Sequence, residues 1–186
     1  YFTAEGYAYD ANGSSRISFT NSTPGIVEDY IKLCRALFGV EPRTRGNEIY
    51  FDALSLRLFF ESLGWPIPTN AGTKTIPDIL FKCPDAEIAA FLQGYLDGDG
   101  NVYRSGVRVT TKSRRLAYQV QMLLTRLGVV GLVARIRSRA TKTMVEKRDY
   151  FEVRIFGDDV ATLSRWIHLR CARKQQLLVD LVDRLG

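Results

Sequence analysis

The chain has 186 residues, of which 46% are hydrophobic and 25% charged, and its formal net charge is +6. This composition is typical of a globular protein and excludes a disordered tail, and no apolar run approaches the ~18 residues that a membrane helix needs. Three widely spaced cysteines and one histidine, His168, argue against a disulfide framework and against sites built from several histidines. We therefore expect no membrane partner, and a location in the cytoplasm of a prokaryote or in another reducing compartment.

Hydrophobic periodicity and the positions of proline and glycine predict an alternation of helices and strands. Pro24 and Pro84 suit first helical turns, and Gly39, Gly64 and Gly128 follow the last turns of three predicted helices. The predicted helices cover residues 24–38, 53–63, 84–98, 113–127, 158–167 and 172–184. The predicted strands cover residues 14–20, 46–52, 102–111, 132–138 and 150–156.

The predicted elements repeat with a period of about 95–100 residues. The segment YFTAEG at 1–6 aligns with YLDGDG at 95–100, and Lys74 aligns with Lys174. We predict two related halves, residues 1–84 and 85–186, with pseudo-twofold symmetry. A site on such an axis takes one residue from each half.

The helix at 84–98 ends in Asp97-Gly98-Asp99-Gly100 and carries a stripe of small residues. An acid at a helix C-terminus meets the negative end of the helix dipole, so Asp99 is a functional candidate. Its partner in the repeat is Glu5, and helices packed along their small residues would bring both carboxylates together. Mg²⁺ suits one carboxylate from each half plus phosphate oxygens. Taken alone, the DGDG segment is also compatible with an ordinary helix-to-loop turn.

Asp97 points about 160° around the same helix from Asp99, and we interpret it as structural.

The positive charge is concentrated in residues 85–186, which carry 18 basic and 11 acidic residues. Such a field attracts a polyanion, although a solubilising surface remains an alternative. Basic residues alternate with small and apolar ones near 104–109 and 132–139, which predicts strands with a basic face and a core face. Because such a sheet can enter a major groove, we expect double-stranded DNA as the partner. The candidate DNA-binding residues are Arg16, Arg43, Arg45, Arg104, Arg108, Lys112, Arg135, Arg137, Arg139, Lys142, Lys147, Arg148 and Arg154.

The motifs resemble those of the LAGLIDADG homing endonucleases. FLQGYLDGDG at 91–100 resembles the second signature helix of that family, and YFTAEG at 1–6 resembles the end of the first. Residues 74–77 and ARKQQLL at 172–178 resemble the lysine block and the closing block of the intein-associated branch. The chain begins inside the first motif, so the earlier turns of that helix are not part of this sequence.

The resemblance implies an α+β fold of two pseudo-symmetric αββαββα halves. A central pair of LAGLIDADG helices would separate two antiparallel β-sheets that form a DNA-binding saddle. It implies a monomer acting as a pseudo-dimer, which cuts both strands of a long DNA target with Mg²⁺ and leaves 3′ overhangs. In this chain Glu5 and Asp99 would be the metal-binding catalytic acids. Lys74 and Lys174 would be the catalytic basic residues, which polarise the attacking water or offset charge on the phosphate.

Several alternatives stay open at this point. The same fold could serve a non-cleaving DNA-binding regulator or an RNA-binding intron maturase. On sequence alone, Lys74 could be a surface residue and Lys174 part of a solvated helix start. An intein-borne and a free-standing endonuclease are both compatible with the sequence.

Overall fold

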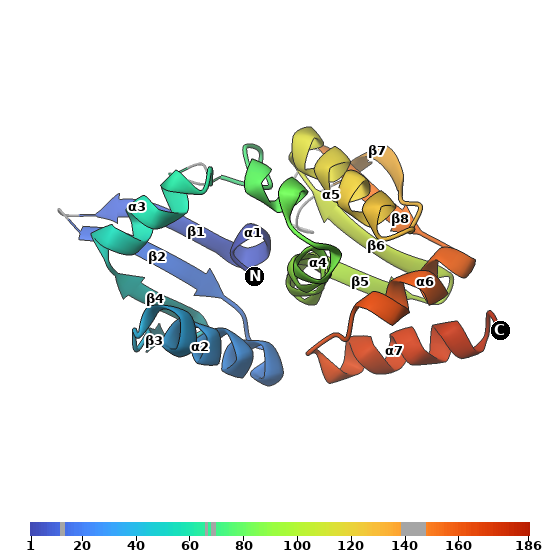
Figure 1. The fold of residues 1–186 in the computed structure, drawn as a ribbon, viewed down its shortest axis with the longest axis horizontal. Coiled ribbons are helices and arrows are strands. Elements are labelled where there is room, and N and C mark those ends of the chain that lie inside the picture. Colours follow the sequence, from blue (N-terminus) through green and yellow to red (C-terminus); the bar gives the residue numbers. More distant parts are fainter. Residues whose placement is uncertain (12–13, 66, 68–69, 139–147) are drawn as a thin grey trace.

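The computed structural model describes residues 1–11, 14–65, 67, 70–138 and 148–186. Two groups of elements follow the same order along the chain (Figure 1). The first group is α1 (Phe2–Glu5), β1 (Gly6–Ala11), β2 (Ser14–Thr20), α2 (Pro24–Phe38), β3 (Arg43–Arg45), β4 (Glu48–Asp52) and α3 (Leu54–Ser62). The second group is α4 (Asp85–Asp99), β5 (Gly100–Tyr103), β6 (Gly106–Thr111), α5 (Arg114–Arg126), β7 (Leu132–Ser138), β8 (Arg148–Ile155) and α6 (Asp158–Trp166).

Two further helices lie outside the repeated order. The 3₁₀-helix η1 (Asp78–Lys82) joins the groups, and α7 (Ala172–Asp183) follows the second one.

Each group builds one four-stranded antiparallel sheet, and the two sheets have the same strand order. The first runs β1-β2-β4-β3 and the second β5-β6-β8-β7. Figure 1 shows the sheets on opposite sides of α1 and α4. The predicted α+β class, with two αββαββα units and two antiparallel sheets, is therefore confirmed. The division of the chain at residues 84 and 85 stays a prediction.

Most predicted elements agree with the structure to within a few residues, but the single strand at 102–111 is wrong. A turn at Arg104–Ser105 divides it into β5 and β6, which pair with each other. Gly106 permits this arrangement, since a Cβ there would lie 2.3 Å from the Ile155 carbonyl oxygen. The two strands β1 and β3 had no separate prediction. All residues of β3 are exposed, so β3 has no alternation of apolar and polar residues that would reveal it in the sequence.

The short helix α1 packs against α4 along the small residues of both helices. A Cβ on Gly98 would lie 2.6 Å from the Ala4 Cβ, and a Cβ on Gly94 would lie 3.0 Å from the Tyr1 nitrogen. Carbon atoms do not approach to 2.6 Å in native packing, so position 98 requires glycine, whereas a side chain at position 94 would require a small shift of Tyr1. The predicted small-residue contact between the two helices is confirmed.

Two hydrophobic cores lie under the two sheets, and each receives a side chain from the other half. Ala4 of α1 is buried in the core that contains Leu92, Tyr95 and the strands of the second sheet. Cys171, which precedes α7, is buried in the core beneath the first sheet. Such exchanged contacts fix the two halves against each other.

Two remaining sequence expectations concern the cysteines and membrane helices. Cys34, Cys83 and Cys171 carry free thiols. Within the described parts of the chain, none of the helices has the length and apolarity required to cross a bilayer.

The tight contact at Gly98 predicts the effect of adding one methyl group. Alanine at an exposed helix position is favoured over glycine by up to about 1 kcal/mol. Overpacking costs about 1–3 kcal/mol, so Gly98→Ala should reduce the free energy of unfolding in urea denaturation. In Gly72→Ala the new Cβ would lie 3.5 Å from its nearest neighbour, and the change should stay within about 0.5 kcal/mol. Equal stability of wild type and Gly98→Ala would contradict the packing described.

Candidate active site

Glu5 and Asp99 are the last residues of α1 and α4, and the contact between these helices brings them together. The Glu5 Cγ and Cδ atoms lie 3.4 and 3.6 Å from the point where a Cβ on Gly98 would stand. The Glu5 carboxylate also accepts a hydrogen bond from the Asn21 side-chain amide. An acidic group from each half is thus present at the centre of the molecule.

The surroundings of Asp99 favour its neutral form. Although the side chain reaches solvent, partial removal from water raises the pKa of Asp99 to about 6. The positive charge of Lys74 opposes this rise, and the negative charge of Glu5 adds to it. A nearby cation would favour ionised Asp99, because it compensates the lost hydration.

Two cavities lie beside the helix pair, and each contains an acid and a lysine from different halves. One has about 330 Å³ and is lined by Glu5, Lys174, Asp97, Gly98, Asn47 and residues 20–23. The other has about 250 Å³ and is lined by Asp99, Lys74, Lys112 and Tyr150. The acids and lysines are therefore combined crosswise, with Glu5 near Lys174 and Asp99 near Lys74.

Both lysines donate hydrogen bonds to carbonyl groups at the ends of the helix pair. The Lys74 Nζ donates to the Ala4 carbonyl. The Lys174 Nζ donates to the carbonyls of Leu96 and Gly98, each at 3.1 Å. Partial burial lowers the pKa of both lysines, and the nearby acids counteract this effect. These side chains are half-buried parts of the site and do not belong to a solvated surface.

The donor atoms at this centre suit a hard divalent cation. The carboxylates of Glu5 and Asp99 are oxygen ligands, and the helix ends present carbonyl oxygens that already attract ammonium groups. No group of three or more His, Cys, Asp or Glu side chains that could hold a metal occurs among the described residues. An ion here would complete its shell with water and phosphate oxygens, as Mg²⁺ commonly does.

Asp97 connects α4 with the start of α7. Its side chain is only 1% exposed, and Oδ1 accepts the backbone N–H groups of Arg170 at 2.8 Å and Cys171 at 3.2 Å. Burial raises the pKa of Asp97, and the two N–H groups counteract this rise. These bonds hold the chain where α7 begins and so place Lys174, in agreement with a structural role for Asp97.

The sheet face opposite each buried core is called here the open face. Cross-strand pairing puts Arg16, Ser18 and Thr20 on the open face of the first sheet, where Arg43 and Arg45 join them. This arrangement agrees with the alternation in the sequence. Tyr7, Tyr9 and Tyr50 occupy the same face, and the Arg16 guanidinium lies 4.0 Å from the centre of the Tyr50 ring.

The open face of the second sheet contains fewer arginines than the sequence predicts. Arg108 pairs across the strands with Arg154, and Arg148 shares their face. Arg135 and Arg137 lie on the opposite face, because Arg135 pairs with Phe151 in the register that pairs Val133 with Val153. The expectation that these two arginines share a face with Arg108 is wrong.

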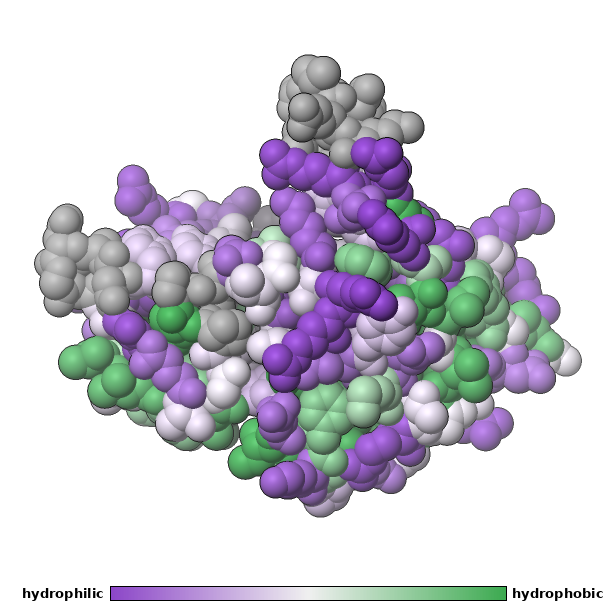
Figure 2. All heavy atoms as spheres, turned by 90° about the horizontal axis from the view of Figure 1, so that it is seen from above, coloured by the Kyte–Doolittle hydropathy of each residue, from purple (hydrophilic) through white to green (hydrophobic). Residues whose placement is uncertain are grey.

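The physical reason for this difference is which face of the second sheet packs against the hydrophobic core. Val153 is buried in the core, whereas Arg135 and Arg137 are exposed at the outer end of the β7–β8 hairpin. Alternation along one strand separates two faces but does not tell which of them the core covers. Figure 2 shows hydrophilic side chains gathered in the upper part of that view.

The other candidate DNA-binding residues have varied positions. Arg104 lies in the turn between β5 and β6, and Lys112 lines the cavity that contains Asp99. Arg139, Lys142 and Lys147 lie outside the described residues.

Acidic residues on the open faces were missed in the sequence. Asp52 accepts two hydrogen bonds from Arg16, at 2.8 and 3.0 Å. Glu152 is 5% exposed and lies between Arg108, at 3.5 Å, and Arg154, at 2.6 Å. These acids hold guanidinium groups in fixed orientations. Which arginines lie next to these acids across the strands can be recognised only once the strand register is known.

Comparison with known proteins gives matches of two kinds. Residues 86–166 match the family model of the LAGLIDADG-like domain. The sequence is 31% identical over 153 residues to a DNA polymerase of Thermococcus sp. (strain GE8), covering 79% of this chain and 9% of that protein. It is 27% identical over 165 residues to a subunit of the A-type ATP synthase of Methanopyrus kandleri, covering 89% of this chain and 15% of that protein. The chain thus spans less than a sixth of these relatives.

Solved structures show the same fold. The homing endonuclease I-DmoI in complex with DNA and Ca has a TM-score of 0.64 and 16% identity, covering 90% of this chain and 88% of that one. The meganuclease I-SmaMI bound to uncleavable DNA has a TM-score of 0.52 and 12% identity, covering 95% of this chain and 83% of that one.

The charges around Asp99 predict a shift that can be measured directly. Because Lys74 lowers the pKa of Asp99, Lys74→Met should raise it further above about 6. An NMR titration of the Asp99 carboxyl carbon would give the value in both proteins. Lys82→Met removes an exposed lysine of η1 and should leave the pKa of Asp99 unchanged. An unchanged pKa in Lys74→Met would show that the two groups do not interact.

Proposed function

We propose that this chain, which belongs to the LAGLIDADG homing endonuclease family, is a site-specific DNA endonuclease. It uses Mg²⁺ to cut both strands of a long DNA target and leaves 3′ overhangs. The observation that carries this proposal is the crosswise pair of cavities at the ends of α1 and α4, one lined by Glu5 and Lys174 and the other by Asp99 and Lys74. Each cavity would serve one strand of the duplex.

The chemistry needs a cation, an attacking water and a group that balances charge on the phosphate. Glu5 and Asp99 would hold Mg²⁺, which supplies Lewis-acid stabilisation of the developing negative charge and of the leaving 3′ oxygen. Lys74 and Lys174 carry positive charge beside the carboxylates of Glu5 and Asp99. They would orient water or offset the charge of the phosphate. The reaction requires no histidine, which agrees with the single His168 of the sequence.

The open faces of the sheets support binding in the major groove. Arg16, Arg108 and Arg154 are held by acids and stacked or paired side chains, so their donors have fixed directions. Fixed guanidinium groups can read base edges, while mobile ones mainly contact phosphates. Arg135 and Arg137, on the other face, are not placed to read bases in the same groove.

The relatives support an origin within an intein. One relative is a DNA polymerase and another is a subunit of an ATP synthase, and these two kinds of protein have unrelated functions, yet each contains a segment similar to this chain. The shared segment covers 9% and 15% of those proteins. A sequence inserted into unrelated hosts has this distribution. We infer that the chain is the endonuclease part of an intein, acting as a monomeric pseudo-dimer in a reducing compartment that holds DNA.

Two other functions would use the same fold. A non-cleaving regulator would have no need for two acids and two lysines around one centre, so the four side chains favour the endonuclease. An RNA-binding maturase would share the basic faces. Tight binding of RNA without nicking of any DNA would favour the maturase.

Removing one carboxylate should separate cleavage from binding. Asp99→Asn keeps the shape of the side chain but loses the charge that holds Mg²⁺, so cleavage should fall by about 10² or more. The measurement uses a duplex selected from a randomised library, with cleavage and Kd determined separately. The control Asp85→Asn removes an acid at the start of α4 that pairs with Arg126 at 2.7 Å. Loss of binding in Asp99→Asn, or full cutting, would contradict the proposed role.

The two faces of the second sheet predict different effects on DNA recognition. Arg154→Gln should weaken binding by about 1–3 kcal/mol and change the preferred bases. Arg137→Gln should keep the base preference and change only the salt dependence of Kd. Selection of preferred sites by each variant tests this difference. A changed base preference in Arg137→Gln alone would contradict the assignment of faces.

A further inference from the structure

Lys74 and Lys174 occupy equivalent positions at the ends of the helix pair, but one lies in an irregular segment and the other in a helix. Lys174 lies in the first turn of α7, whose hydrogen-bond ladder fixes its position. Lys74 lies in the segment 70–77, which is neither helix nor strand. A lysine on such a segment is held in place only if other groups fix the backbone around it.

Asn70 fixes the segment before Lys74. Its side-chain Oδ1 accepts the backbone N–H groups of Gly72 at 3.0 Å and Thr73 at 3.1 Å. Its backbone carbonyl accepts the N–H of Lys74 at 3.2 Å. This turn sets the local shape of the segment, but all of its partners lie within the segment itself. It therefore does not attach Lys74 to the rest of the protein.

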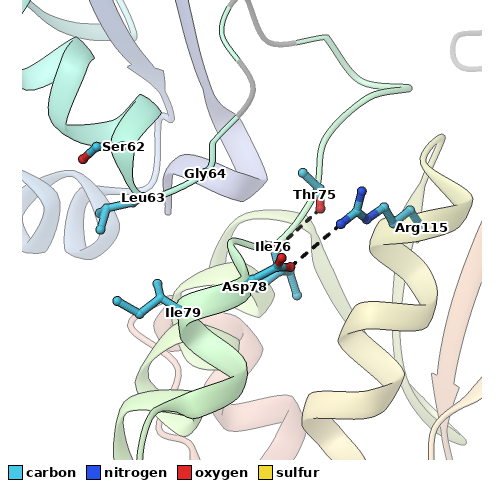
Figure 3. A pocket seen from close by; sticks show the side chains of 8 residues that line it. All are labelled: Ser62, Leu63, Gly64, Thr75, Ile76, Asp78, Ile79 and Arg115. Atoms are coloured by element: carbon cyan, nitrogen blue, oxygen red, sulfur yellow. Dashed lines mark hydrogen bonds and ion pairs between the residues drawn. The ribbon is translucent and has the colours of Figure 1, made fainter.

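Gln119 of α5 provides that attachment on the other side of Lys74. Its Oε1 accepts the Thr75 hydroxyl at 2.8 Å and the Ile76 N–H at 2.9 Å, and its Nε2 donates to the Ile76 carbonyl at 3.0 Å. Gln119 is 7% exposed and Ile76 is 1% exposed, so water does not compete for the two bonds between these residues. Figure 3 shows Thr75 and Ile76 beside α5, with Arg115 extending from that helix toward them.

The ion pair that follows this segment is weaker. Asp78 and Arg115 form an ion pair at 3.8 Å with both side chains exposed, beside a cavity of about 350 Å³ (Figure 3). Exposed pairs of this kind contribute little to rigidity. The buried hydrogen bonds of Gln119 are therefore the main polar anchor of the backbone next to Lys74.

We propose that Gln119 is a positioning residue for Lys74 and, through it, for the cleavage of one DNA strand. This inference rests on the proposed endonuclease function. Lys74 shares its cavity with Asp99, whereas Glu5 and Lys174 line the other cavity. The start of α7 is held separately, by Asp97. Loosening the segment at Thr75 and Ile76 therefore disturbs one centre and leaves the other intact.

The experiment measures the two strands separately. A selected target duplex with a different label on each strand gives two single-turnover rate constants. Lys74→Met identifies the strand that depends on Lys74. Gln119→Leu should slow cleavage of that same strand by about tenfold or more, since misplacing a catalytic group by an ångström reduces rates strongly. The other strand should change by less than about twofold, so that nicked DNA accumulates.

A matched control exists on the same helix. The Gln121 side chain donates to the Gly131 carbonyl at 2.6 Å, away from Lys74, and Gln121→Leu should leave both rates unchanged. Gln119→Glu keeps the acceptor for Thr75 and Ile76, so it should restore part of the strand-specific rate. Hydrogen exchange at the Ile76 amide should be fast in Gln119→Leu and slow in wild type and Gln121→Leu.

Each outcome supports or overturns a defined statement. Slow cleavage of one strand, shared by Lys74→Met and Gln119→Leu, supports the inference. Equal slowing of both strands by Gln119→Leu, or no slowing, overturns it while the endonuclease function stands. Absence of any cutting by wild type overturns the proposed function and this inference with it.

Discussion

The close contact between α1 and α4 is the constraint on which the site depends. It exists because Ala4 and Gly98 leave no side-chain bulk between the helices. Without that approach the carboxylates of Glu5 and Asp99 would lie on separate surfaces. Their mutual repulsion opposes the contact, and the raised pKa of Asp99 reflects part of that opposition. The packing around α1 and α4 therefore offsets the repulsion between the two carboxylates. The same closeness of two carboxylates suits the binding of a cation.

When no cation is bound, the two lysines reduce the electrostatic repulsion between Glu5 and Asp99. Each ammonium group donates to carbonyls at a helix end, where the helix dipole is negative, and lies near the acid of the other half. Because acid and lysine come from different halves, neither half contains a complete centre. Both proposed centres therefore require the contact between the two halves, which also buries apolar surface.

The two halves have the same topology but are not equivalent in detail. The first open face is rich in tyrosine, and the second has arginines gathered around the buried Glu152. Lys74 is held through Gln119 and Lys174 through Asp97. Such differences mean that a substitution in one half has no exact counterpart in the other.

The sequence by itself determined the longer helices, the repeat and the four residues proposed for the centre. Apolar periodicity, the small-residue stripe ending at Gly98 and the aligned pairs Glu5–Asp99 and Lys74–Lys174 are local or repeated patterns. They can be recognised without knowing any contact, since one copy serves as a reference for the other.

Only the tertiary structure decided which lysine belongs with which acid, which face of β7 the core covers, and that Gln119 anchors Thr75 and Ile76. These properties depend on strand register and on contacts between residues far apart in the chain. A shift of register by one residue would exchange the faces of β7 without changing a letter of the sequence. Hydrogen bonds between residues far apart in the chain likewise leave no local pattern in the sequence, so only the folded structure reveals them.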